Sequence, residues 1–135
     1  MSNTGREYHQ QMVHYLRKRI TYANDGEEVL VGVVPAGSII HKAASGVFVH
    51  EVFNAGSTNQ LDIGTNGGDT SASDDPDLYG TNLALGTLGF VPLDEAVSYK
   101  LDKWTKITAS VDLTGTAATT GIADVVIAYI PNNDG

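Results

Sequence analysis

Short apolar runs alternate with turn residues along residues 29–64 of the chain. The stretch reads VLVGVVPAGSIIHKAASGVFVHEVFNAGSTNQLDIG. The breaks between the runs are Pro35-Ala36-Gly37, Ser45-Gly46 and Asn54-Ala55-Gly56. The runs are rich in β-branched residues, which favour strands, whereas Gly, Ser, Asn and Pro favour tight turns. The pattern therefore predicts short β-strands joined by tight turns.

The same pattern continues over most of the chain. We predict strands at 28–34, 38–44, 46–53, 59–63, 86–91, 96–101, 104–113 and 122–130. Pro35 should end the first of these strands, because proline has no N–H to donate to a sheet. About eight or nine strands at even spacing indicate an all-β fold, an antiparallel β-sandwich or a closed barrel. A jelly roll is the first choice, and an immunoglobulin-like sandwich is the alternative.

The first 22 residues differ from the rest, because neither face of this segment is cleanly apolar. Residues alternate from Tyr8 to Tyr22 as they would in a strand. A helix is the alternative, because Val13, Leu16 and Ile20 fit a helical period. We predict an extended N-terminal arm over residues 1–22 that becomes a strand. A single β-sandwich domain should follow over residues 23–135, after the turn signal Asn24-Asp25-Gly26.

Charge is distributed unevenly between these two parts. The chain of 135 residues carries a formal net charge of −8, to which residues 1–22 contribute +3 and the remainder −11. A basic arm on an acidic body predicts electrostatic attraction between copies of the chain or to a larger partner. An equally good alternative is a solvated edge strand kept soluble by Arg and Lys. The net charge argues against general nucleic-acid binding, because contacts with phosphates require a cationic surface.

Tyrosine and arginine occur together in the basic segment, a mixture typical of protein recognition surfaces. Trp104, close to Lys103 and Lys106, is a further candidate, because tryptophan is frequent at binding hot spots. A core tryptophan at the start of a strand is the alternative for this residue. The candidate interface residues are Tyr8, Tyr15, Arg17, Lys18, Arg19, Tyr22 and Trp104.

Residues 64–82 interrupt the strand pattern. They read GTNGGDTSASDDPDLYGTN, and loops of this length are usually functional or disordered. Clustered carboxylates on a loop can bind Ca²⁺. The candidate ligands are Asp69, Asp74, Asp75 and Asp77. Their spacing does not match an EF-hand, so a solvated acidic loop is the favoured interpretation and no metal is assigned.

Catalytic motifs are missing from the sequence. The chain has no cysteine, which excludes disulfides, thiolate metal sites and a cysteine nucleophile. His41 and His50 lie on neighbouring predicted strands, but two histidines are too few for a typical metal site. Neither a Gly-x-Ser-x-Gly elbow nor a phosphate-binding loop occurs. We therefore predict a protein that is not an enzyme and has no cofactor.

Membrane insertion and export are not predicted either. No apolar run approaches the roughly 20 residues that span a bilayer. The N-terminal residues MSNTGREYHQ lack the apolar core of a signal peptide, so we expect no export by that route.

Several turns of the predicted sandwich resemble those of a known family. The matching segments are Val34-Pro35-Ala36-Gly37-Ser38-Ile39-Ile40, Phe53-Asn54-Ala55-Gly56-Ser57-Thr58-Asn59, Leu61-Asp62-Ile63-Gly64-Thr65 and 115–121. Together with the following Asp-rich loop and the valine-rich last strand, they resemble the capsid decoration (cement or head-stabilising) proteins of tailed bacteriophages. The resemblance extends over about residues 28–130 and leaves the basic arm uncovered.

The resemblance implies a jelly-roll protein on the outer surface of the virion, made in the host cytoplasm. Its partner would be the major capsid protein, whose neighbouring copies it clamps, and it would form a homo-oligomer, a dimer or alternatively a trimer. Deleting residues 1–22 should then leave a folded body and abolish shell binding. The alternative function is a small carbohydrate-binding jelly roll, dependent on Ca²⁺ through the 69–77 loop.

Overall fold

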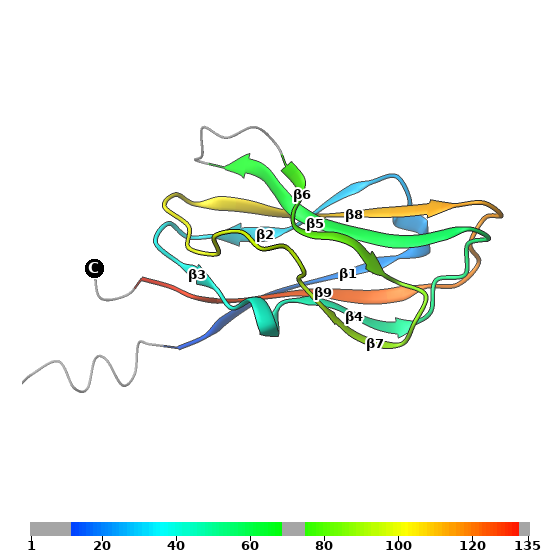
Figure 1. The fold of residues 1–135 in the computed structure, drawn as a ribbon, viewed down its shortest axis with the longest axis horizontal. Helices are drawn as coiled ribbons and strands as arrows, with labels where there is room; N and C mark the ends of the chain where they lie inside the picture. The colour runs from blue at the N-terminus through cyan, green and yellow to red at the C-terminus, as the bar shows by residue number, and fades with distance from the viewer. Residues whose placement is uncertain (1–11, 69–74, 133–135) are drawn as a thin grey trace, which may run out of the picture.

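The computed structural model describes residues 12–68 and 75–132 of the chain. Strands dominate it, and their bounds are β1 His14–Thr21, β2 Glu28–Val34, β3 Ile39–Ile40, β4 Gly46–Glu51, β5 Thr58–Gly68, β6 Asp75–Ala84, β7 Gly89–Pro92, β8 Thr105–Thr114 and β9 Ile122–Ile130. Two short 3-10 helices, η1 Tyr22–Asn24 and η2 Lys42–Ala44, join some of these strands. The strands form two sheets stacked as a sandwich (Figure 1). The all-β prediction is confirmed.

Each sheet combines strands from the two halves of the chain. The first sheet has the order β1-β9-β4-β7, with β3 also paired to β9, and the second has the order β2-β8-β5-β6. The antiparallel pairs are nested, since β1 pairs with β9, β2 with β8, β4 with β7 and β5 with β6. This nesting is compatible with the jelly roll expected from the sequence.

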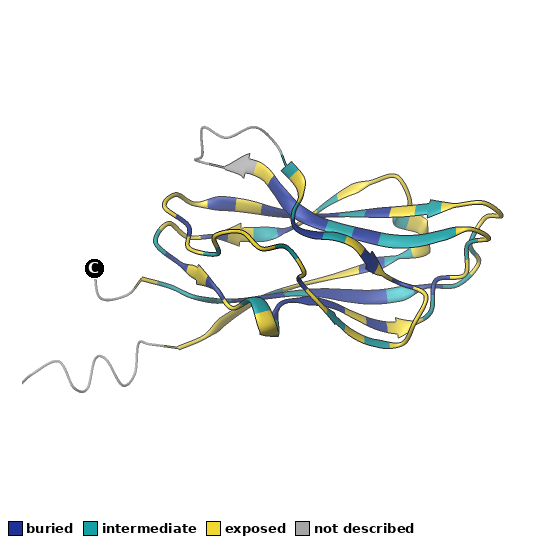
Figure 2. Cartoon of the chain, in the orientation of Figure 1, coloured by how far each residue is buried: buried dark blue, intermediate teal, exposed yellow. Residues whose placement is uncertain are grey.

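A hydrophobic core fills the space between the two sheets. Alternation along β9 turns Val125 and Ile127 inward, and both side chains are fully buried. Leu61 of β5 and Ile107 of β8 meet them from the second sheet, again without exposed surface. Figure 2 shows the buried residues concentrated along the middle of the strands and the exposed ones at the ends and turns. Each such side chain stabilises the fold by about 1.5–3 kcal/mol.

Several strand predictions match the structure, and two do not. Strands β2 and β9 have the predicted bounds 28–34 and 122–130, and Pro35 follows the end of β2. The predicted strand 38–44 is divided into β3 and η2. The predicted strand 96–101 is wrong, because in the described part of the chain only Tyr99 and Leu101 make backbone hydrogen bonds there, with residues 37–40. That ladder is too short to form a strand, and Lys100 makes only an isolated bridge to Ile39.

The second half of the predicted arm, residues 1–22, contains a strand. Residues 14–21 form β1, which pairs with β9 over its whole length, and Ile20 is fully buried in the core. The helical alternative is therefore wrong for residues 14–21. Because β1 pairs with β9 in the first sheet, deleting residues 1–22 would remove one strand of the sandwich together with the arm. Tyr8 lies outside the described residues.

The predicted loop of residues 64–82 is largely a hairpin. Strand β5 continues to Gly68 and β6 begins at Asp75, while Asp69 and Asp74 lie outside the described residues. Gly64 allows the two strands to approach closely, because a Cβ there would lie 2.1 Å from the carbonyl oxygen of Asp75. From the sequence, Gly64 was interpreted as part of a loop, but in the fold it permits close packing of two strands. Among the described residues there is no helix long and apolar enough to cross a membrane.

Candidate interaction face

Three strands of the first sheet build a distinct site on its outer face. Because Val125 and Ile127 of β9 face the core, their neighbours Asp124 and Val126 face outward. The register places Arg19 of β1 opposite Asp124 and Arg17 opposite Val126. On the other side of β9, Phe48 of β4 is the partner of Asp124. Side chains distant in the sequence therefore meet on one surface.

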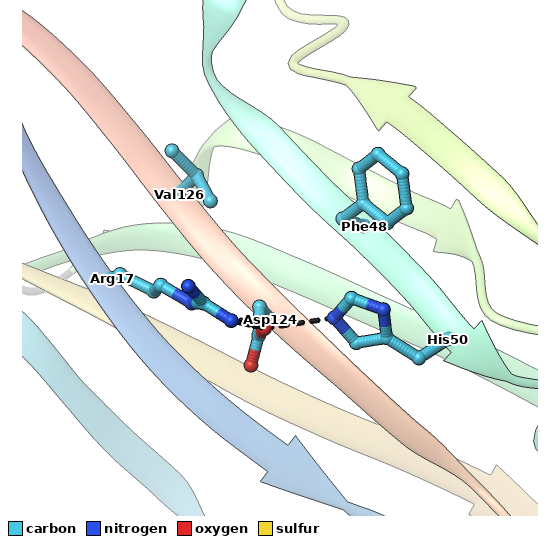
Figure 3. A pocket seen from close by; sticks show the side chains of 5 residues that line it. All are labelled: Arg17, Phe48, His50, Asp124 and Val126. Atoms are coloured by element: carbon cyan, nitrogen blue, oxygen red, sulfur yellow. Dashed lines mark hydrogen bonds and ion pairs between the residues drawn. The ribbon is translucent and has the colours of Figure 1, made fainter.

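Asp124 is the centre of this site. Although it is on the outer side of the sheet, only 2% of its surface is exposed, because neighbouring side chains cover it. Arg17 Nη2 donates to Oδ2 at 2.5 Å, and Arg19 Nε donates to Oδ1 at 3.0 Å. His50 Nε2 lies 2.8 Å from Oδ2. Arg17 and His50 approach the carboxylate from opposite sides (Figure 3).

The electrostatic environment keeps Asp124 ionised. Burial by itself would raise the pKa of the carboxyl, but hydrogen bonds from Arg19, His50 and Arg17 hold the pKa well below its usual range. The same contact with Asp124 raises the pKa of Arg19. Two guanidinium groups therefore face one carboxylate, which leaves an excess positive charge at this cluster in a chain whose net charge is −8.

Apolar and aromatic groups surround these charges. A shallow pocket of about 240 Å³ is lined by Arg17, Phe48, His50, Asp124 and Val126. Phe48 is 45% exposed, and its ring centroid lies 6.4 Å from that of Phe90 on β7, which is 40% exposed. Tyr15 on β1 is 63% exposed. The arrangement combines an apolar surface with fixed cationic groups, which suits binding of another macromolecule.

The structure separates the interface residues predicted from the sequence. Tyr15, Arg17 and Arg19 share the outer face of β1, whereas Lys18 alternates to the opposite side of the strand. Tyr22 is exposed in η1. Trp104 precedes β8 of the other sheet and is 38% exposed. Part of the predicted set therefore belongs to one surface, and the rest does not.

Sequence reasoning missed Asp124, Phe48 and His50 as parts of this site. An acidic residue within the apolar strand IADVVIAYI was the available signal, because a buried carboxylate needs charged or hydrogen-bonding partners. His50 was considered only together with His41. Their partners are separate, since His41 caps the start of η2, where its Nδ1 accepts a hydrogen bond from the backbone N–H of Ala44.

The acidic residues proposed as calcium ligands form only a partial group in the structure. Asp75 and Asp77 lie together on β6, and a hydrogen bond between their side chains raises the pKa of Asp75. Burial and the charge of Asp77 act in the same direction. Within residues 12–68 and 75–132, no three His, Asp or Glu side chains are arranged to hold a metal ion.

Comparisons with known proteins show a likeness in fold to a solved structure. No protein-family model matches the chain. No curated protein matches its sequence. A chain in the solved structure described as the cyanophage Pam1 capsid asymmetric unit is similar, with a TM-score of 0.57 and 18% sequence identity. The match covers 90% of this chain and 84% of that chain. At this identity the likeness shows a shared fold over nearly the whole length.

Proposed function

We propose that this chain is a structural protein of a bacteriophage virion that binds the outside of the head and clamps neighbouring major capsid proteins. The observation that carries the proposal is the likeness in fold to a chain of a phage capsid asymmetric unit, which covers 90% of the residues. The turns around Pro35-Ala36-Gly37 and Asn54-Ala55-Gly56, which resemble those of phage decoration proteins, support the same function.

The architecture suits such a function physically. A clamp requires a rigid body with an exposed binding surface, and the sandwich supplies a continuous core below the outer face of the first sheet. Arginine and aromatic residues on that face are the types that contribute most to binding at protein interfaces. A shell is symmetric, so many copies multiply the effect of an individually modest interface.

The acidic remainder of the chain fits a position on the exterior. Packaged DNA would repel a protein with a net charge of −8, whereas the outside of a shell imposes no such penalty. We propose that the chain is made in the host cytoplasm and joins the head as a homo-oligomer, a dimer before a trimer. Light scattering of the purified chain tests the oligomer, and a monomeric mass at micromolar concentration would contradict it.

Reconstitution tests the proposed function. Heads assembled from the major capsid protein of the same virus, without this chain, are mixed with the purified chain and sedimented. We expect saturable co-sedimentation, added density on the outer surface in electron micrographs, and a higher temperature of head disruption. An unrelated acidic β-sandwich protein of similar size serves as the control for nonspecific binding. Absence of co-sedimentation, or density only on the inner surface, would refute the proposal.

A further inference from the structure

We infer that the outer face of the first sheet, centred on the Arg17–Asp124–His50 cluster, is the surface that docks on an acidic patch of another protein. The inference rests on the proposed function, where that protein is the major capsid protein. It goes further by assigning the contact to one of the two sheets and by naming the chemistry of the partner surface as carboxylates next to apolar side chains.

The two arginines are held in place before any partner arrives. Arg17 reaches Asp124 through Nε and Nη2, and Arg19 does so through the same two atoms. Their side chains remain 65% and 58% exposed. Within the described residues neither Nη1 atom has a hydrogen-bond partner, so donors remain for an incoming carboxylate. Fixing the side chains beforehand reduces the entropy lost on binding.

Aromatic groups next to the arginines supply the apolar part of the contact. Phe48 packs beside His50, with ring centroids 5.3 Å apart, and it borders the shallow pocket together with Val126. Phe90 extends this surface onto β7, and Tyr15 extends it along β1. A partner side chain that enters the pocket would bury aromatic surface while its neighbouring carboxylate meets the guanidinium groups.

The balance of charge favours an acidic partner over a second copy placed face to face. Within the cluster itself Arg17 and Arg19 outnumber Asp124. Glu51 is the register partner of Ile122 at the end of the same face, where it accepts a hydrogen bond from the backbone of Gly121. A twofold contact through this face would bring the two arginine pairs together, and like charges repel. A carboxylate-bearing surface satisfies the same arginines without that repulsion.

The outer face of the second sheet has the opposite charge and provides a natural comparison. Because Leu61, Ile63, Ile107 and Ala109 face the core, the alternate positions of β5 and β8 face outward. The charged residues at outward positions of β2, β5 and β8 are Glu28, Asp62, Asp112 and Lys106. That face carries net negative charge, so an acidic partner would be attracted to the first sheet and repelled by the second.

Binding of variants to the heads tests the inference. Arg17→Gln removes one charge yet keeps side-chain donors near Asp124, and Phe48→Ala removes an exposed ring. We expect each variant to bind the heads about tenfold more weakly or worse. The matched controls on the second sheet are Lys106→Gln, with the same change of charge, and Leu30→Ala, an exposed apolar truncation. Both controls should bind like the wild type.

The outcomes separate this inference from the proposed function. If the wild-type chain does not bind the heads, the proposed function fails and the docking surface fails with it. If the wild-type chain binds and both first-sheet variants bind equally well, the head-binding function stands and the surface assignment is overturned. A variant that binds normally but loses its oligomeric state would instead make a second copy the occupant, which also overturns the proposal. Should Arg17→Gln not fold, Phe48→Ala and Tyr15→Ala decide, because both residues are exposed.

Discussion

Arg19 Nε donates a hydrogen bond to Asp124 Oδ1 at 3.0 Å, and these two residues are direct register partners on β1 and β9. The pair joins an edge strand of the first sheet to the strand beside it. Asp124 is buried while the side chain of Arg19 is more than half exposed. The contact therefore compensates the desolvation of the carboxylate at little cost to the arginine, which keeps most of its hydration.

Asp124→Asn should lower the stability of the fold at neutral pH by about 1–3 kcal/mol, because hydrogen bonds to an ionised carboxylate are stronger than those to an amide. The pKa of Asp124 in the folded state is lower than in the unfolded state, so its contribution is present at neutral pH. It is lost as the pH falls below about 4, where the unfolded state takes up the proton first. Urea unfolding at several pH values measures both effects.

The difference between the wild-type chain and Asp124→Asn should therefore narrow as the solution becomes acidic. Asp112→Asn is the matched control, because this exposed carboxylate on the second sheet forms no ion pair with another described residue. It should leave the unfolding free energy nearly unchanged. A parallel pH dependence in the wild-type chain and Asp124→Asn would show that the carboxylate does not stabilise the fold in this way.

Gly64→Ala should destabilise the fold by about 1–3 kcal/mol, because the added methyl group overpacks a close contact between strands. A Cβ at this position would lie 2.1 Å from the carbonyl oxygen of Asp75 and 2.4 Å from the carbonyl carbon of Pro76. Both are backbone atoms, so relief requires β6 to move. Thermal unfolding measures the loss of stability.

Gly86→Ala is the control, since a Cβ there has no atom within 4 Å. Equal melting temperatures of the two variants would contradict the close-packing explanation.

Local sequence signals predicted much of the fold. β2 and β9 were found with their observed bounds, because apolar β-branched runs and the flanking Pro35 and Gly121 act over a few residues. The placement of β1 was not accessible in this way. Its partner strand β9 lies about a hundred residues away in the sequence. Arg17 and Arg19 interrupt the apolar alternation of β1 because their side chains bind Asp124 of that strand. Glycine occurs both in turns and where two strands pack closely. The sequence of residues 64–82 does not distinguish these cases, and Gly64 belongs to the second.

The candidate site was predictable only in part for the same reason. Tyr15, Arg17 and Arg19 were singled out because composition is a local signal. Their common face, and the separation of Lys18 and Trp104 from it, depend on which strand lies beside which. Pairings between distant strands determine that arrangement, and one sequence does not reveal them.

Asp77→Asn should lower the pKa of Asp75. The hydrogen bond between the two side chains is the largest cause of the raised pKa of Asp75, and the negative charge of Asp77 adds to it. An amide removes that charge, so the carboxyl of Asp75 should release its proton at lower pH. A carbon-detected NMR titration of the carboxyl groups measures the change. Asp112→Asn should leave the titration of Asp75 unaltered, and an unshifted curve in Asp77→Asn would mean that the two carboxyls do not interact.

Tyr79 should make the stability of the fold sensitive to alkaline pH. Its side chain is 2% exposed, and burial, followed by the nearby Tyr99 and Asp75, raises its pKa to about 12. In the unfolded chain a tyrosine ionises near pH 10, so above that pH the unfolded state loses a proton that the folded state retains. Stability should therefore decline as the pH rises from about 10 to about 12. Tyr79→Phe should reduce this decline, measured by urea unfolding and by phenolate absorbance, and the remainder is expected from Tyr99, whose pKa is also raised by burial. Tyr22→Phe, which removes an exposed phenol, is the control, and an equal alkaline decline in Tyr79→Phe and the wild-type chain would exclude Tyr79 as its source.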